Sequence, residues 1–214
     1  MTPQPNKRTL IFIITLVLVT AFTLNSCKKK IRGCMDPMST NYNAKATEDD
    51  GSCSYMSIGD NFQGGKIAYI LVSGDPGYDA KIRHGLIVAP TDQGPTIQWF
   101  NGTNVVTGAV ATTLGSGNAN TSAIVSAQST GSYAAKICSD LVLGGYSDWY
   151  LPSLTELNKV FLNRAAIGVF ADDGYWSSSE KGPNTAWVQY FYTSGSQSAN
   201  DKSYKYSLRA VRSF

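Results

Sequence analysis

The sequence is poor in the side chains on which most hydrolases depend. It contains one histidine, His84, among 214 residues. A serine nucleophile needs a base within hydrogen-bond reach and a third group that orients the base. No G-x-S-x-G turn is present to expose such a serine. Histidine and cysteine also do not cluster at the spacing of a zinc site. These absences argue against a serine hydrolase and against a metalloenzyme.

Charge is scarce as well, at 15% of the residues. The net charge of +3 falls to +1 without residues 1–26, which hold two basic and no acidic residues. It becomes −3 from Gly33 onward, because four more basic residues precede that position: Lys28, Lys29, Lys30 and Arg32. A nucleic-acid-binding domain instead carries a basic patch. We therefore expect no nucleic-acid partner.

No hydrophobic run is as long as a membrane-spanning helix. The apolar run of residues 10–24 has 15 residues and follows Lys7 and Arg8, which is typical of a secretory signal. It ends in Leu24-Asn25-Ser26-Cys27, which resembles the lipobox of bacterial lipoproteins. That resemblance implies removal of residues 1–26 and a lipid, such as palmitate, on Cys27. The alternative is an ordinary signal peptide with an incidental cysteine.

The lipoprotein interpretation predicts a location as well as a modification. Residues 27–32 become a lipidated basic tether that faces anionic lipid head groups. We expect the protein in the bacterial cell envelope with the membrane as a partner through Cys27, at the outer membrane if the cell is Gram-negative.

The remaining cysteines divide into a pair and a single thiol. Cys34 and Cys53 bracket an Asp- and Asn-rich segment, residues 33–56, that has too few apolar side chains to form a core. We expect these two to form a disulfide. The segment resembles a GC-DP-NYN-DDGSC stalk element of secreted bacterial proteins. Cys138 lies on an apolar helical stripe with Ala134 and Leu141, which favours a buried, inert thiol.

The stalk segment also carries enough side-chain oxygens for a calcium ion. EF-hand spacing is missing, since Ala46 stands where the first ligand before Asp50 and Gly51 would lie. Asx-turns explain the same residues without a metal. No cofactor is required, and the candidate calcium ligands are Asp36, Asn41, Asn43, Asp49 and Asp50.

Residues 57–214 are enough for one domain. Runs typical of strands cover residues 66–72, 85–89, 97–100, 186–192 and 206–212. Helices are predicted over residues 120–128, over 132–142 and from Ser153, where Ser153 and Glu156 form a capping box. Strands, then helices, then strands predict an α+β fold with a mainly antiparallel sheet.

Several motifs of this domain occur together and in a fixed order. They are GGKIAYIL (64–71), HGLIVAPTDQG (84–94), GGYSDWYLPSLTEL (144–157), GYWSSSE (174–180), AWVQYF (186–191) and SLRAVRSF (207–214). In this combination residues 57–214 resemble the C-terminal domain family of the collagen-like bacterial adhesin Lcl. The resemblance implies a C-type-lectin-like fold and binding of sulfated glycans. This chain has no Gly-X-Y collagen stretch, so trimerisation and the adhesin role do not transfer directly.

Two other branches of the lectin-like fold fit the chain less well. The calcium-dependent lectins use a carboxylate-bearing triplet, but this chain has Gly182-Pro183-Asn184 and no later Trp-Asn-Asp. The formylglycine-generating enzymes rely on a cysteine pair, and Cys138 stands alone in the domain.

The GYWSSSE motif has three interpretations: a nucleophile beside a base, a ligand-binding rim, or serines that brace a turn. Glu180 beside Ser177, Ser178 and Ser179 could act as a base, but nothing marks a partner for it. The structural interpretation is that Tyr175 and Trp176 pack in a core while the serine hydroxyls satisfy backbone groups. We favour the structural interpretation.

The last thirteen residues are rich in cations. Lys202, Lys205 and Arg209 could form a ridge that meets the sulfates or carboxylates of an anionic glycan. The alternative is a solvated edge strand protected by charge.

Taken together, the sequence predicts a non-enzymatic, lipid-anchored envelope module for binding or adhesion that recognises a glycan or a surface protein. A structural subunit of a surface assembly is the alternative. An enzyme on a formylglycine-generating-enzyme-like scaffold is the third hypothesis.

Overall fold

The computed structural model describes residues 29–192 and 194–214. The predicted signal sequence and Cys27 lie outside the described residues. Within the described part, no helix is both long enough and apolar enough to cross a membrane.

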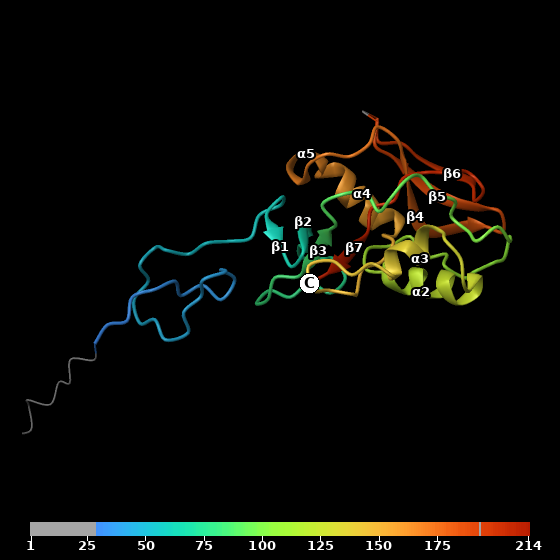
Figure 1. The fold of residues 1–214 in the computed structure, drawn as a ribbon. Coiled ribbons are helices and arrows are strands. Elements are labelled where there is room, and N and C mark those ends of the chain that lie inside the picture. The colour runs from blue at the N-terminus through green and yellow to red at the C-terminus, as the bar shows by residue number, and fades with distance from the viewer. Residues whose placement is uncertain (1–28, 193) are drawn as a thin grey trace, which may run out of the picture.

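The domain contains two antiparallel sheets and four helices (Figure 1). The first sheet has the order β1-β2-β3-β7 and the second has the order β4-β5-β6. The strands are β1 (Asn61–Phe62), β2 (Gly65–Ile70), β3 (Gly85–Val88), β4 (Gly174–Gly182), β5 (Thr185–Tyr190), β6 (Gln197–Asp201) and β7 (Val211–Ser213). The helices are α2 (Gly117–Gln128), α3 (Ala134–Ser139), α4 (Leu154–Leu162) and α5 (Arg164–Ile167). The predicted α+β class is confirmed, while the C-type-lectin-like fold stays a prediction.

Helix α4 begins where its sequence predicts. The Ser153 side chain accepts from the Glu156 amide, and the Glu156 carboxylate accepts from the Ser153 amide at 2.7 Å. The same carboxylate also accepts from the Gly115 amide at 3.0 Å. Burial raises the pKa of Glu156. This capping box therefore also fixes the loop that leads into α2.

Two predicted strands are wrong. Residues 97–100 form no strand, because only Ile97 makes a single bridge, to Tyr206. Residues 206–212 were predicted as one strand, but they change partners along their length. Ser207 bridges Tyr175 of the second sheet, whereas Val211 pairs with Val88 of the first. The segment passes from one sheet to the other, so it cannot keep the alternation of a single strand.

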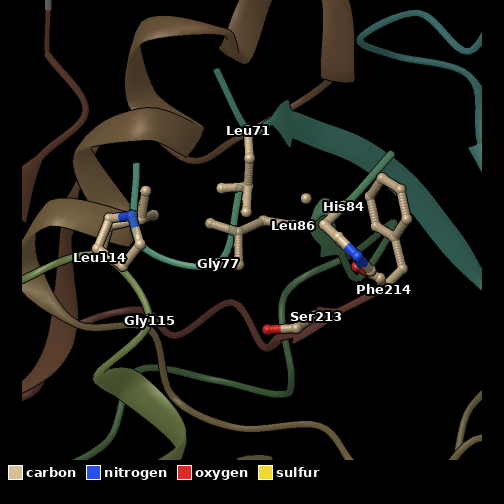
Figure 2. A pocket seen from close by; sticks show the side chains of 10 residues that line it. Leu71, Gly77, His84, Leu86, Leu114, Gly115, Ser213 and Phe214 are labelled. Atoms are coloured by element: carbon tan, nitrogen blue, oxygen red, sulfur yellow. The ribbon is translucent and has the colours of Figure 1, made fainter. Parts of the chain in front are cut away.

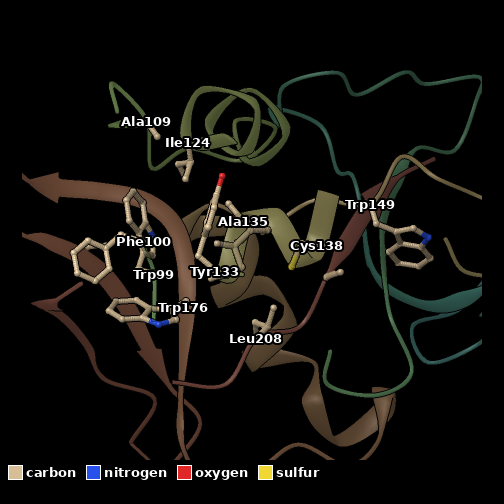
Figure 3. Close-up of a cluster of buried hydrophobic side chains, with 14 of the residues drawn as sticks. Trp99, Phe100, Ala109, Ile124, Tyr133, Ala135, Cys138, Trp149, Trp176 and Leu208 are labelled. Carbon is tan, nitrogen blue, oxygen red and sulfur yellow. The ribbon is translucent and has the colours of Figure 1, made fainter. Parts of the chain in front are cut away.

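The larger of the two cores lies between the second sheet and helices α2 and α3. Trp99 and Trp176 are fully buried there, and Ile124 and Tyr133 reach the same cluster from the helical side (Figure 3). Cys138 belongs to this cluster, and burial raises the pKa of its thiol. The predicted burial of this thiol is confirmed. Since the thiolate is the reactive form, its low reactivity stays a prediction.

The stalk, residues 33–56, lies to one side of the domain (Figure 1). The predicted disulfide between Cys34 and Cys53 is present. Arg83 joins the stalk to the domain: its side chain donates to the Met38 carbonyl at 3.1 Å and lies over the Tyr55 ring at 5.3 Å. Besides the disulfide, the stalk is held by hydrogen bonds such as those of Asn41 with Ser52 and Ser54, because most of its side chains are exposed or half-exposed and form no core.

Removing this disulfide should therefore affect the stalk alone. We expect the double substitution Cys34→Ser and Cys53→Ser to destabilise the stalk by about 3 kcal/mol, since the cross-link restricts the unfolded chain. Limited proteolysis should then cut within residues 33–56. The melting temperature of the domain should stay that of the unsubstituted chain. A large fall in the domain's melting temperature would contradict the independence of the two parts.

Candidate functional site

The three serines of GYWSSSE are structural. All three lie within β4 and are fully buried. Ser177 donates to the Trp187 carbonyl and Ser179 to the Ala111 carbonyl, each at 2.8 Å. Ser179 also accepts from the Leu154 amide at the start of α4. Each hydroxyl thus satisfies backbone or side-chain groups that would otherwise be buried without a partner.

Glu180 and Lys202 form a fully buried ion pair. Their side chains are 1% and 0% exposed, and Lys202 Nζ lies 2.6 Å from Glu180 Oε1. The carboxylate also accepts from the amides of Thr107 and Gly108, at 3.0 and 3.1 Å. The ammonium also donates to the carbonyls of Val105 and Pro183. With every donor of Lys202 occupied, neither residue is available as a base or as a ligand for solvent-borne groups.

The predicted cationic ridge is wrong for two of its three members. Lys202 is buried with Glu180, and Arg209 is 3% exposed with its side chain bound to Asp92 at 2.5 Å. Arg209 also donates to three carbonyls, those of Ala89, Pro90 and Val169. Only Lys205 is exposed. Because the segment crosses between sheets, its cations pair with carboxylates inside the domain.

The buried pair makes a sharp prediction for stability. Lys202→Met leaves the Glu180 charge without its partner, so we expect a loss of about 3–5 kcal/mol in the free energy of unfolding. Adding Glu180→Gln to Lys202→Met should recover part of that loss. Lys205→Met is the matched control and should change stability by about 0.5 kcal/mol or less. Urea unfolding measures all three variants. Equal unfolding midpoints for Lys202→Met and Lys205→Met would show that the pair does not stabilise the fold.

The domain has an apolar recess of about 240 Å³ beside the first sheet (Figure 2). Leu71 and Leu86 lie within it, and His84 stands at its wall. Nδ1 of His84 lies 3.1 Å from the Phe214 carbonyl oxygen, and the Ser213 hydroxyl is hydrogen-bonded to the Tyr150 hydroxyl. The single histidine and the nearest serine are therefore both engaged with groups of the scaffold.

A second recess, of about 420 Å³, lies along helix α2 and is lined by hydroxyl groups. Its charged member is Asp148, which forms two hydrogen bonds with Arg212 at 2.7 and 2.8 Å. The side-chain hydrogen bond with Arg212 lowers the pKa of Asp148. Because it is engaged with Arg212, Asp148 is not free to act as a base in this recess.

The aromatic surface of the second sheet is the most distinctive exposed feature. We call it the tyrosine surface: Tyr190, Tyr192, Tyr204 and Tyr206. Its rings touch in sequence, with centroids 5.2 Å apart for Tyr192 and Tyr190, 6.1 Å for Tyr190 and Tyr206, and 6.5 Å for Tyr206 and Tyr204. Tyr192 is 41% exposed and Tyr204 is 56% exposed. Four contiguous rings with two so open to solvent form a ready contact area.

Two members of the tyrosine surface, Tyr190 and Tyr206, are fixed by packing and by hydrogen bonds. Tyr206 packs edge-on against the buried Trp176, with ring centroids 4.9 Å apart. The hydroxyls of Tyr190 and Tyr206 are 3.3 Å apart, and the Asn200 amide donates to that of Tyr190. Burial raises the pKa of Tyr206. The surface therefore offers apolar ring faces, hydroxyls and the nearby exposed Lys205.

The predicted calcium ligands act as turn-forming side chains. Asp36, Asn43, Asp49 and Asp50 each accept from a backbone amide two residues later, as in Asx-turns. The Asn41 side chain bonds to Ser52 and Ser54 across the stalk. Among the described residues, no group of three or more His, Cys, Asp or Glu side chains could hold a metal ion. These contacts are those of Asx-turns, the interpretation that needs no metal.

The comparisons with known proteins give one family and one remote structural similarity. Residues 89–212 match the family described as the Lcl C-terminal domain. No curated protein matches the chain in sequence. Among solved structures, a fimbrial protein from Bacteroides ovatus ATCC 8483 is similar with a TM-score of 0.44 and 16% identity. That similarity covers 79% of this chain but only 47% of the other, and it is too remote to support an argument.

The stretch that matches the family begins inside the folded domain, after the first three strands. The matched stretch begins at Ala89, whereas β2 (Gly65–Ile70) pairs directly with β3 in the same sheet. The matched stretch also contains GYWSSSE, the buried pair Glu180–Lys202 and the whole tyrosine surface. Because this stretch is more than half of the 214 residues, the chain belongs to the Lcl C-terminal domain family.

Proposed function

We propose that this protein is a non-enzymatic binding module of the cell surface that contacts its partner through the tyrosine surface. One observation carries the proposal: the four rings contact one another in a row, with the partly buried Tyr190 and Tyr206 between the exposed Tyr192 and Tyr204. Tyrosine is enriched at binding surfaces because it contributes large contact area and a hydroxyl at a low cost in conformational entropy.

Membership of the family supports a binding role. A catalytic role is disfavoured for a separate reason, because the residues that suggested it are engaged in hydrogen bonds within the scaffold. Ser177, Ser179 and Glu180 have partners in the scaffold, and His84 lies beside the Phe214 carbonyl oxygen. A nucleophile would need a free base in hydrogen-bond reach. A structural subunit without a soluble ligand remains the second candidate.

The chemistry of the surface favours a glycan or a protein as the partner. Ring faces stack on the apolar faces of sugars or on side chains, while the hydroxyls and the Asn200 amide bond to polar groups. Lys205 would add attraction for a sulfate or carboxylate. This replaces the predicted three-cation ridge by one cation beside aromatic rings.

Binding tests should separate the tyrosine surface from the rest of the domain. A glycan array and surface-protein capture with the purified chain identify the ligand. We expect Tyr204→Ala and Tyr192→Ala each to cost about 1–2 kcal/mol of binding, or roughly 5- to 30-fold in affinity. Their melting temperatures should be unchanged, because exposed side chains contribute little to stability.

The matched control for these variants is Tyr78→Ala. Tyr78 is 40% exposed, similar to Tyr192, and lies in the loop before β3. It should bind like the unsubstituted chain. Equal binding by Tyr204→Ala and Tyr78→Ala would remove the tyrosine surface from the mechanism. Binding that survives EDTA is expected, since the proposed contacts need no metal.

We also propose that a lipid on Cys27 attaches the protein to the cell surface. The support is the sequence Leu24-Asn25-Ser26-Cys27 after a 15-residue apolar run. Cys27→Ser should abolish acyl labelling and release the protein from the membrane fraction or leave the leader uncleaved. A cleaved, acyl-labelled Cys27→Ser protein in the membrane fraction would contradict the proposal.

A further inference from the structure

Strand β6 leaves an open edge on the second sheet. It is the last strand in the order β4-β5-β6, and it pairs only with β5 (Figure 1). Within residues 29–192 and 194–214, no other backbone segment hydrogen-bonds to the outer side of Gln197–Asp201, apart from Tyr204, which donates to the Asp201 carbonyl. An edge of this kind exposes unpaired N–H and C=O groups.

The other sheet edges are covered or very short. The outer side of β4 accepts or donates hydrogen bonds with Ser207, Pro152 and Ala109. Strand β7 is covered where Val211 exchanges two hydrogen bonds with Tyr150. Strand β1 has two residues. The contrast singles out β6 within the described part of the chain.

The register decides which residues of β6 direct their backbone N–H and C=O groups away from β5. Lys202 donates to the Asn184 carbonyl and Tyr190 donates to the Ser196 carbonyl, each at 2.9 Å. In this register, the even-numbered residues of β6 are therefore the ones whose backbone groups face β5. The backbone groups of the odd-numbered residues, Gln197, Ala199 and Asp201, face away from β5.

The edge lacks the features that normally prevent edge-to-edge pairing. Such edges usually carry a lysine, a proline or a bulge. The sequence Gln197-Ser198-Ala199-Asn200-Asp201 has neither lysine nor proline, and its pairing with β5 is regular. Its one charged residue, Asp201, stands at the end of the strand.

We propose that β6 is a self-association site at which two copies of this chain pair antiparallel about a two-fold axis at Ala199. The second sheets of both copies then join into one sheet across β6. Each copy contributes three outward residues. Because the Asp201 carbonyl already accepts from the Tyr204 amide, the pairing forms about four main-chain hydrogen bonds. A two-fold interface uses the same surface on both copies, which is the commonest symmetry of soluble oligomers.

The side chains are self-complementary in this register. Ala199 lies opposite its own copy, where a small neutral side chain meets no charge. Gln197 lies opposite Asp201, which places an amide donor opposite a carboxylate. No like charges face each other across the strands in this register.

Charge substitution at the axis tests the proposal on the purified full chain. The variants are Ala199→Lys and Ala199→Glu, each of which places like charges opposite one another in the two-fold pair. By sedimentation analysis, the unsubstituted chain should form dimers, each variant alone should be monomeric, and an equimolar mixture of the two should regain the dimer. Ala127→Lys, at an exposed alanine on α2, is the matched control and should dimerise normally.

Two results would overturn the proposal. One is an unsubstituted chain that stays monomeric at several hundred micromolar. The other is a dimer that persists in Ala199→Lys, which would place the interface elsewhere. Melting curves guard against misfolding, since a variant with an unchanged melting temperature is folded. Ligand binding by the tyrosine surface is measured separately, so either proposal can fail while the other stands.

Discussion

The buried contact between Glu180 and Lys202 holds together parts of the chain that are distant in sequence. The carboxylate at the end of β4 binds the amides of Thr107 and Gly108, and the ammonium binds the carbonyls of Val105 and Pro183. Lys202 also lies over the ring of the buried Trp99, 4.7 Å from its centroid. A charge pair with no contact to water is stable only when all its remaining hydrogen bonds are satisfied. Here the irregular loop at residues 105–109 supplies them, which explains why a long segment without helix or strand is nevertheless ordered.

Ion pairs also anchor the rest of the last thirteen residues. Lys202, Arg209 and Arg212 pair with Glu180, Asp92 and Asp148, respectively. Each pair fixes the segment at a different point as it passes from the second sheet to the first. A strand would satisfy its backbone by one continuous ladder, but a segment that changes sheets needs side-chain anchors. The cations that suggested a ligand are these anchors. The binding surface that we propose instead includes Tyr204 and Tyr206, which lie between Lys202 and Arg209.

The sequence predicted the elements whose signals are local. The capping box set the start of α4, the apolar runs located β2, β3 and β5, and the segment between Cys34 and Cys53 indicated the disulfide. It failed where partners are remote. Strand β4 contains three buried serines and a buried glutamate, so its polarity concealed a buried strand. The tyrosine surface joins residues from two separate stretches, and AWVQYFY and YKY each looked like ordinary strand sequence.

The arrangement of the cysteines restricts how the chain can oxidise. Cys34 and Cys53 are 19 residues apart and precede Cys138, so during synthesis or export they become available before it does. Once the domain folds, Cys138 is 0% exposed within an apolar cluster and its thiol is hard to ionise. Since exchange requires an accessible thiolate, Cys138 is unable to attack the Cys34–Cys53 disulfide in the folded domain. Among the three cysteines that the structure describes, chain order and burial thus both favour the pairing of Cys34 with Cys53.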